Sequence, residues 1–213
     1  MAQCRITEIF YSLQGETRTV GLPTVFVRLT GCPLRCTYCD TAYAFHGGEK
    51  KDISDIVDEV YQYHPRYITV TGGEPLAQPS CHNLLSDLCD RGAEVSLETS
   101  GAMDITAVDP RVVIVMDLKT PASGEESKNR YDNIGKLKSQ DQLKFVICDR
   151  NDYDWARQKL TEYDLANRCE VLFSPIHGEL KPADLAEWIV EDNLPVRMQI
   201  QIHKYLWGDE QGR

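Results

Sequence analysis

The sequence predicts an α/β fold, namely a shortened and incomplete (β/α) barrel built on a mainly parallel sheet. Short runs of strand character alternate with helical patterns along the chain, and these runs, about eight, outnumber the clear helices. Such alternation favours parallel strands with right-handed crossovers. At 213 residues the chain is long enough for one core and shows no long linker, so we expect residues 1–213 to form a single domain.

The expected elements follow in order. The strands are RITEIF (5–10), TVFVRL (24–29), YITVT (67–71), EVSLET (94–99), VVIVMDL (112–118), QLKFVI (142–147), CEVLFS (169–174) and VRMQIQI (196–202). Apolar residues recur at helical spacing over 53–61 and 81–89, and both stripes should face the core. Gly92 suits a helix C-cap, and Pro182 suits the first turn of a helix over 180–192. The polar stretch 123–133 indicates either a mobile loop or lid or a solvated insertion.

Composition narrows the class of protein. The 33 acidic and 23 basic residues give a net charge of −10, which argues against direct binding to nucleic acid or to an anionic membrane. No apolar run is long enough for a membrane span, and the N-terminus has no signal-peptide pattern. We therefore expect a cytoplasmic protein, in which the eight cysteines stay reduced.

Three of these cysteines are clustered in GCPLRCTYCDT, residues 31–41. Cys32, Cys36 and Cys39 follow the strand 24–29 directly, at the strand end where parallel α/β folds place their active sites. Three thiolates hold a four-iron cluster with one iron left open to another ligand. A zinc site completed by His46 or a distant cysteine is the alternative, although no second CxxC arm is present. The other cysteines are expected to be structural: Cys4, Cys81, Cys89, Cys148 and Cys169.

Polar segments also follow three other expected strands: TGGEP (71–75), ETSG (98–101) and MDLK (116–119). Gly72 and Gly73 would let a ligand approach the backbone closely, and Glu74 would accept a hydrogen bond from an ammonium group. Because the ends of parallel strands meet at one rim, further polar side chains are candidates for ribose and carboxylate contacts: Glu98, Ser100, Asp117 and Lys119.

The pattern CxxxCxxC, with Tyr38 before its last cysteine, resembles the radical S-adenosylmethionine superfamily. The resemblance implies that the amino and carboxylate groups of S-adenosylmethionine (SAM) bind the open iron of a 4Fe-4S cluster. An electron from the cluster then gives a 5′-deoxyadenosyl radical. The protein's part is to position that radical and to exclude water. TGGEP resembles the superfamily's segment for the methionine amino group.

A closer resemblance covers nearly the whole chain. SLQGET (12–17), Arg28, the CDT that begins at Cys39, TGGEP and MQIQIHKYLW (198–207) together resemble the 7-carboxy-7-deazaguanine synthase family. Members convert 6-carboxy-5,6,7,8-tetrahydropterin to 7-carboxy-7-deazaguanine with loss of ammonia, as radical SAM carbon-nitrogen lyases on the route to queuosine and other 7-deazapurines. The resemblance implies a homodimer, Mg²⁺, and an electron donor of the flavodoxin or ferredoxin type.

The expected site residues divide by ligand. Those for the pterin are Leu13, Gln14, Gly15, Glu16, Arg28, Thr71 and His203. The alternative for His203 is a structural histidine at a strand end, with its hydrogen bonds made within the protein. Those for SAM are Tyr38, Cys39, Asp40, Gly73, Glu98, Ser100, Asp117, Leu118 and Lys119. Thr41 would ligate Mg²⁺. The chain departs from the family in two places: Thr17 stands where a glycine is common, and Asp117 and Leu118 replace a serine and a proline.

Two other classes remain open. A glycyl-radical-enzyme activase would use the same cluster against a protein backbone, but it should lack the LQGE segment and would need a large partner surface. A non-catalytic zinc-binding module would use the cysteines structurally.

Overall fold

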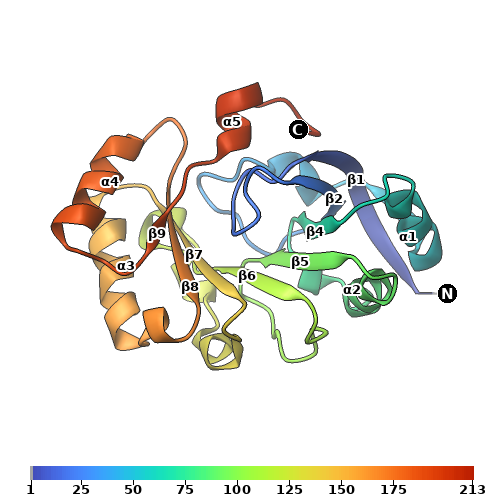
Figure 1. Ribbon diagram of the computed structural model, residues 1–213, viewed down its shortest axis with the longest axis horizontal. Helices are drawn as coiled ribbons and strands as arrows, with labels where there is room; N and C mark the ends of the chain where they lie inside the picture. The colour runs from blue at the N-terminus through green and yellow to red at the C-terminus, as the bar shows by residue number, and fades with distance from the viewer. Residues whose placement is uncertain (1) are drawn as a thin grey trace.

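The computed structural model of the protein describes residues 2–213 and contains one nine-stranded sheet (Figure 1). The spatial order is β3-β1-β2-β4-β5-β6-β7-β8-β9. β1 is antiparallel to β2 and β3, and every other neighbouring pair is parallel. Since β3 and β9 are the two edges, the sheet is an open barrel, as the sequence predicts. The strands are β1 Gln3–Leu13, β2 Pro23–Leu29, β3 Glu49–Asp52, β4 Tyr67–Gly72, β5 Glu94–Thr99, β6 Val113–Asp117, β7 Gln142–Ile147, β8 Glu170–Pro175 and β9 Arg197–Met198.

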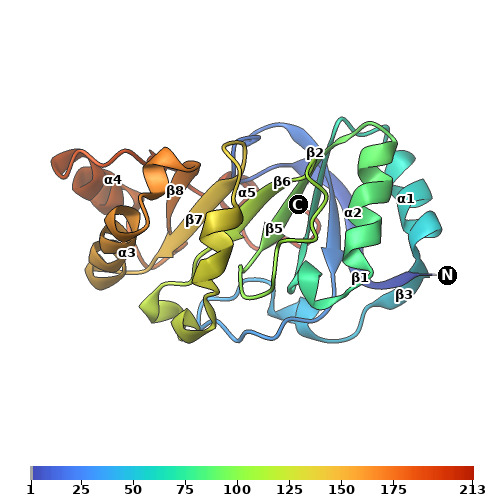
Figure 2. The same cartoon turned by 90° about the horizontal axis from the view of Figure 1, so that it is seen from below.

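Four helices cover the outer side of the sheet: α1 Ile53–Tyr61, α2 Cys81–Asp90, α3 Arg150–Glu162 and α4 Pro182–Glu191. In Figure 1, α1 and α2 lie beside one end of the sheet and α3 and α4 beside the other, whereas the short α5, Ile202–Trp207, lies over the opposite side. In Figure 2, seen from the outer side, α2 lies in front of the strands and α5 behind them. The expected apolar stripes of α1 and α2 are buried, Pro182 begins α4, and Gly92 follows α2 with φ +90°, so these predictions are confirmed.

Two differences from the predicted strands occur at the sheet edges. β3 is an additional edge strand of four residues, EKKD, whose charged sequence carries no strand pattern. The predicted strand over 196–202 is wrong for most of its length, because β9 contains only Arg197 and Met198 and α5 begins at Ile202. The chain leaves the edge of β8 here, and the Ile202 N–H donates instead to the Gly15 carbonyl at 3.1 Å. The C-terminal segment therefore crosses to the inner side of the barrel.

Side chains alternate between two different environments along each central strand. On β7, Leu143, Phe145 and Ile147 are fully buried against the outer helices, while Lys144 and Val146 face the interior of the barrel. The same alternation runs through β4, β5 and β6. The outer face therefore forms the hydrophobic core, and the inner face is left free to carry polar groups.

The segment 123–133 is partly exposed but is hydrogen-bonded to the cysteine loop, residues 31–41. It contains the 3₁₀ turns η4 Glu126–Lys128 and the start of η5 Tyr131–Lys136. The Asn129 side chain accepts from the Lys119 N–H at 2.9 Å and donates to the Lys119 carbonyl at 2.8 Å. Glu125 accepts from the Arg35 N–H at 2.7 Å. These bonds fix the cysteine loop relative to the end of β6. Among residues 2–213 no helix is long and apolar enough to cross a membrane.

Candidate active site

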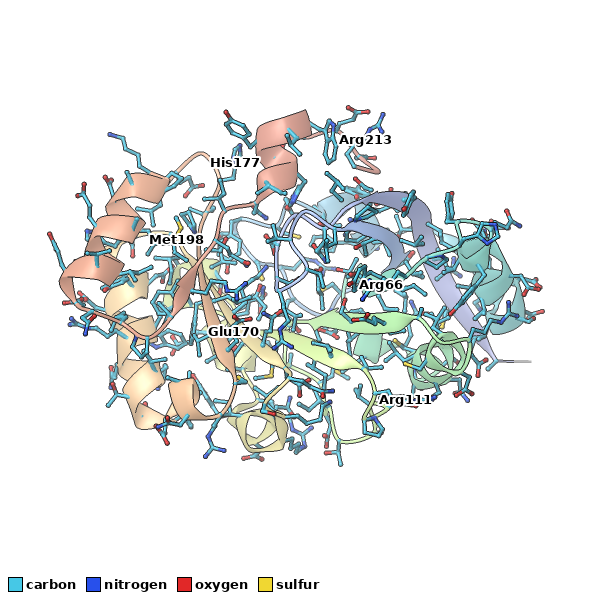
Figure 3. The ribbon with its side chains drawn as sticks, in the orientation of Figure 1. Arg66, Arg111, Glu170, His177, Met198 and Arg213 are labelled. Carbon is cyan, nitrogen blue, oxygen red and sulfur yellow. The ribbon has the colours of Figure 1, made fainter. Side chains whose placement is uncertain are left out.

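A pocket of about 460 Å³ opens on the inner side of the sheet. Its walls come from the carboxyl ends of β4 to β7, from the loop after β1, from the cysteine loop and from α5. Figure 3 shows His177 and Arg213, which also line the pocket, on the same side of the molecule as α5, with Arg111 on the far side. The predicted site residues that line it are Leu13, Gln14, Gly15, Glu16, Arg28, Cys32, Cys36, Tyr38, Cys39, Asp40, Thr41, Thr71, Gly73, Glu98, Ser100, Asp117, Lys119 and His203.

Leu118 is the predicted site residue whose side chain does not reach the pocket. It is 1% exposed and belongs to the hydrophobic core. Its neighbours Asp117 and Lys119 both line the pocket, so the alternation of side chains sends Leu118 to the outer face. Its backbone N–H is also used, donating to the Lys144 carbonyl at 2.9 Å. The Leu118 side chain therefore points away from the proposed SAM site, and a contact through the Leu118 backbone stays a prediction.

The three clustered cysteines meet in this pocket as free, half-buried thiols. The loop is held by the Cys39 N–H, which donates to the Cys36 carbonyl at 3.2 Å, and by Arg35, which donates to the Cys32 carbonyl at 2.7 Å. Burial raises the pKa of Cys36 to about 11, and the nearby Lys119 ammonium opposes that rise. A cation beside the loop favours thiolates, which are the form that binds metal.

The surroundings of these thiols disfavour a zinc site. Cys4, Cys81, Cys89 and Cys169 are buried in the core as predicted, Cys148 is half-buried, and none of these five lines the pocket. His46 is exposed and also lies outside it. The thiols are arranged as a trio without a fourth cysteine or histidine arm.

Gly72 and Gly73 are required by packing between neighbouring strand ends. A Cβ on Gly73 would lie 2.1 Å from the Gly31 carbonyl oxygen, and one on Gly72 would lie 2.2 Å from the Leu29 carbonyl oxygen. Gly72 also has φ +139°. Gly73 lines the pocket. The absence of its side chain is nevertheless explained by contact with the cysteine loop, whereas the sequence interpretation attributed it to ligand approach.

Glu74 was expected to accept from an ammonium group, and its structural environment contradicts this. The side chain is fully buried, and one carboxylate oxygen accepts from the Leu76 N–H at 3.0 Å and from Thr99 Oγ1 at 2.8 Å. The other accepts from the Ser100 N–H at 2.7 Å and from Ser100 Oγ at 2.5 Å. With four internal donors, Glu74 ties the end of β4 to the end of β5, and it also occupies the Ser100 hydroxyl.

A hydrogen-bonded polar cluster lies on the inner faces of β4 and β5. Gln14 Nε2 donates to Thr69 Oγ1 at 3.0 Å and to Glu98 Oε1 at 3.3 Å, and Thr71 Oγ1 donates to Glu98 Oε2 at 2.8 Å. Burial and the neighbouring Glu16 carboxylate raise the pKa of Glu98 above its ordinary value. The predicted pterin residues Gln14 and Thr71 therefore orient a carboxyl group that faces the pocket.

An ionic row continues from this cluster toward the cysteines. Lys144 Nζ lies 2.5 Å from Glu16 Oε2 and 3.8 Å from Asp117 Oδ2, and Asp117 Oδ2 lies 3.0 Å from Lys119 Nζ. Asp117 Oδ1 is buried and has no hydrogen-bond partner in the described part of the chain. Burial opposes the charge of Lys144, yet the carboxylates of Glu16, Asp117 and Glu98 outweigh it and raise the pKa of that lysine. Sequence reasoning missed Lys144; its place between Leu143 and Phe145 in QLKFVI was the available signal.

Arg28 lies in an aromatic corner of the pocket. Its Nε is 2.6 Å from Glu8 Oε1, and the same oxygen accepts from the Tyr43 hydroxyl at 2.7 Å. The guanidinium carbon lies 5.7 Å from the centre of the Phe10 ring, which stacks on Phe26 at 4.9 Å. The cross-strand pairs Glu8 with Arg28 and Phe10 with Phe26 explain the arrangement, because β1 and β2 are antiparallel and in register there.

Asp40 and Thr41 form an oxygen-rich part of the wall beside the last cysteine. Thr41 Oγ1 donates to Asp40 Oδ1 at 2.7 Å. Partial desolvation of Asp40, whose side chain is 44% exposed, opposes its ionisation, but Thr41 and the charge of Lys204 together lower the pKa of that carboxyl. Lys204 Nζ lies 3.8 Å from Asp40 Oδ2 and 2.8 Å from Asp209 Oδ1, so it connects the cysteine loop to the C-terminal tail. Lys204, Asp209 and Arg213 line the pocket and were not predicted.

His203 lies on α5, so the alternative of a histidine at a strand end is wrong. Its ring packs directly on Gly15, where an added Cβ would lie 1.9 Å from His203 Nδ1. Burial lowers the pKa of His203 and favours the neutral imidazole. The LQGE loop and α5, which are 186 or more residues apart in sequence, are thus held together at the pocket.

Comparison with known proteins agrees with this geometry. The family model of the Radical SAM superfamily matches residues 26–115. The 7-carboxy-7-deazaguanine synthase of Chlorobaculum tepidum is 42% identical over 98% of this chain and 96% of its own length. That of Koribacter versatilis is 41% identical over 97% of this chain and 98% of its own.

Solved structures support the fold. QueE from Escherichia coli superposes with a TM-score of 0.77 at 22% identity, covering 93% of this chain and 94% of that one. SuiB from Streptococcus suis, bound to its precursor peptide SuiA, has a TM-score of 0.60 at 14% identity, covering 80% of this chain and 46% of its own. The chain is 41–42% identical to these synthases over nearly its whole length, and its pocket contains the three-cysteine loop. It therefore belongs to the 7-carboxy-7-deazaguanine synthase family of radical SAM enzymes.

Proposed function

We propose that this protein converts 6-carboxy-5,6,7,8-tetrahydropterin to 7-carboxy-7-deazaguanine with loss of ammonia, using a 4Fe-4S cluster, SAM and Mg²⁺. The single observation that carries the proposal is the composition of the pocket. It gathers three free thiols with the polar side chains of the LQGE loop, the ends of β4 to β7 and α5. The names of its relatives specify the product of the same reaction.

The cysteine end of the pocket fits a cluster and SAM. Cys32, Cys36 and Cys39 supply three thiolates without a fourth, and Lys119 lies close enough to Cys36 and Cys32 to offset their negative charge. When bound, such a cluster supplies the electron that cleaves SAM. On the protein side, Asp117 Oδ1 is a buried acceptor still lacking a donor. A ribose hydroxyl of SAM would satisfy it, and Tyr38 would pack beside the same ligand.

The part of the pocket lined by Glu16, Glu98 and Arg28 suits the ring and the carboxylate of the pterin. A pterin presents N–H donors along one edge of its ring, and Glu16 and Glu98 offer carboxyl acceptors on the pocket wall. Arg28 is paired with Glu8 through Nε only, so its Nη groups remain to grip the substrate carboxylate. Phe10 and Phe26 supply an apolar wall, and His203 and Lys204 of α5 also line the pocket.

For Mg²⁺ the support comes from the chemistry of the wall at Asp40 and Thr41. A hydroxyl and a carboxylate are hard oxygen ligands of the kind that Mg²⁺ prefers, and this ion commonly completes its shell with water and substrate oxygens. Thr41 would bind the ion, with the substrate supplying further oxygens. The Thr41 hydroxyl could keep donating to Asp40 while one of its oxygen lone pairs binds the ion.

The test is a product assay under anaerobic conditions. Reconstituted protein is incubated with carboxytetrahydropterin, SAM, Mg²⁺ and dithionite, and 7-carboxy-7-deazaguanine and ammonia are measured. We expect both products in equal amounts. Cys36→Ala should form none, whereas the matched variant Cys148→Ala, whose half-buried thiol lies outside the pocket, should remain active. Reductive cleavage of SAM without use of the pterin would overturn the proposal in favour of an activase.

Three features of the family extend the proposal. We infer a homodimer and an electron donor of the flavodoxin or ferredoxin type, with the product serving queuosine or another 7-deazapurine. Exposed apolar side chains at Val190, Tyr205 and Leu206 are compatible with a second copy covering part of the surface. Light scattering of the purified protein should give about twice the 24.2 kDa chain mass, and a mass of one chain would contradict the dimer.

A further inference from the structure

We propose that Lys144 is a positioning residue that makes the binding of SAM depend on the charge of Glu16, the carboxylate that contacts the Lys144 ammonium. This inference rests on the proposed function, which places SAM beside Asp117 and Lys119. Neither the sequence motifs nor the family resemblance identifies Lys144. Its role follows from the ionic row on the inner face of the sheet.

The row crosses the pocket through side chains from three separate segments. Glu16 follows β1, Lys144 lies on β7, and Asp117 ends β6. Lys144 Nζ contacts Glu16 Oε2 at 2.5 Å and lies 3.8 Å from Asp117 Oδ2, which pairs with Lys119 at 3.0 Å. Each of these side chains is between 10% and 17% exposed, so solvent screens the interactions weakly.

The unequal distances give Lys144 two alternative partners. Its ammonium is in contact with Glu16 and one short movement away from Asp117, and a lysine stem is flexible enough for that movement. If the charge of Glu16 is removed, the ammonium should move toward Asp117. A buried element with two arrangements is the physical requirement for coupling between two sites.

The movement of Lys144 would change the affinity for a ligand that binds Asp117. Its Oδ1 lacks a partner within residues 2–213, although it is buried on the pocket wall. A ligand donor at Oδ1 binds more strongly when the carboxylate is less neutralised by cations. Drawing Lys144 onto Asp117, which already pairs with Lys119, should therefore weaken a ligand that donates to Oδ1.

A structural role alone would give a different result. Lys144 also compensates the buried carboxylates of Glu16 and Glu98, so its loss should lower stability whether or not it couples the ligands. Stability therefore cannot distinguish the two roles. The distinguishing quantity is the effect of Glu16 on SAM affinity, measured with and without Lys144.

The experiment is a double-mutant cycle read by SAM binding alone. The dissociation constant is measured by anaerobic calorimetry on reconstituted protein with an oxidised cluster and no pterin, for the unmodified chain, Glu16→Gln, Lys144→Met and the double variant. We expect Glu16→Gln to weaken SAM binding by about fivefold or more when Lys144 is present, and by less than about twofold when it is absent. Lys51→Met, which removes a lysine paired with Glu59 outside the pocket, should leave the constant unchanged.

Each outcome is decisive. An equal effect of Glu16→Gln in both backgrounds, or no effect in either, overturns the inference while the product assay can still support the proposed function. If the unmodified protein binds SAM as the cycle predicts but forms no product from the pterin, the coupling stands and the proposed substrate fails. Should Lys144→Met not fold, as a thermal melt would reveal, Lys144→Gln replaces it and the same criterion applies. Failure of the reconstituted unmodified protein to bind SAM overturns both.

Discussion

The outer and inner faces of the same strands differ in what their side chains do. On β7, Phe145 points outward, is fully buried, and contacts Trp155 and Phe173 edge to face at 6.0 and 5.4 Å. Its neighbour Lys144 points inward and pairs with Glu16 across the pocket. Adjacent residues thus belong to different structures, one holding the helices on the sheet and the other facing the ligands. Residues that stabilise the fold and residues that face the ligands therefore alternate one by one along the strand.

The two faces also bury their side chains through different interactions. The outer face removes apolar area from water against α1 to α4. The inner face keeps charged groups buried by pairing them with one another, as Glu16 with Lys144 and Asp117 with Lys119. Such pairs add little stability compared with a hydrophobic substitute of the same shape. We therefore expect substitutions on the two faces to have opposite profiles, which the following variants test.

The largest effect is expected for Cys36→Ala. This thiol lines the pocket and is half-buried, so its loss should abolish conversion of the pterin and change the unfolding free energy of the iron-free protein by no more than about 1 kcal/mol. Iron analysis, the product assay and urea unfolding measure these effects. A Cys36→Ala protein that forms product at the normal rate would show that the cysteine loop does not hold the cluster.

On the outer face, Phe145→Ala should have the reverse profile. Truncating this fully buried ring should lower the unfolding free energy by about 3 to 5 kcal/mol, because the cavity is lined by aromatic partners on α3 and β8. The remaining folded protein should bind SAM with unchanged affinity. Urea titration gives the first quantity and calorimetry the second. Stable protein with impaired SAM binding would contradict the separation of the faces.

Glu74→Gln tests the boundary between the faces. The carboxylate accepts four hydrogen bonds from the ends of β4 and β5, and an amide offers one acceptor oxygen in place of two. We expect a loss of about 1 to 3 kcal/mol in unfolding free energy. The matched variant Glu59→Gln, whose side chain is 37% exposed and paired with Lys51, should cost about 1 kcal/mol or less. Equal losses in both variants would show that Glu74 is not a structural tie.

The smallest effect is a dependence on pH at Glu98. Burial and Glu16 raise the pKa of this carboxyl above its ordinary value of 4.5. Below pH 4.5 Glu98 is protonated in both the folded and the unfolded protein, so Glu98→Gln should change the stability little. As the pH rises, the unfolded chain releases this proton first, so the unmodified protein loses stability that the glutamine variant keeps. Melting temperatures at pH 4, 6 and 8 should therefore show a gain for Glu98→Gln that grows with pH. A gain that shrinks with pH would contradict the raised pKa.

Much of this architecture could be predicted from the sequence because its signals are local. The helical stripes of α1 and α2, the strands β4 to β8 and the polar groups at their ends all show periodicity or spacing that one segment carries by itself. The pocket follows from topology, since parallel strands bring their carboxyl ends to one rim.

The remaining features depend on contacts between distant segments. The lack of space for a side chain at Gly73 and the hydrogen bonding of Glu74 depend on Gly31 and Ser100, whose proximity no spacing reveals. The predicted SAM contact at Gly73 stays a prediction. The VRMQIQI run alternates like a strand, yet most of it leaves the sheet because α5 docks on Gly15. Lys144 could have been found by applying the alternation on β7, as could the exclusion of Leu118.

The proposed reaction requires that the inner face hold a cluster by three thiolates and leave one iron open for SAM. Electron paramagnetic resonance of the reduced, reconstituted protein tests it most directly. We expect a 4Fe-4S signal whose g values change when SAM is added, because SAM then ligates the open iron. A well-folded protein that shows no such signal, or a signal that SAM leaves unchanged, would contradict it.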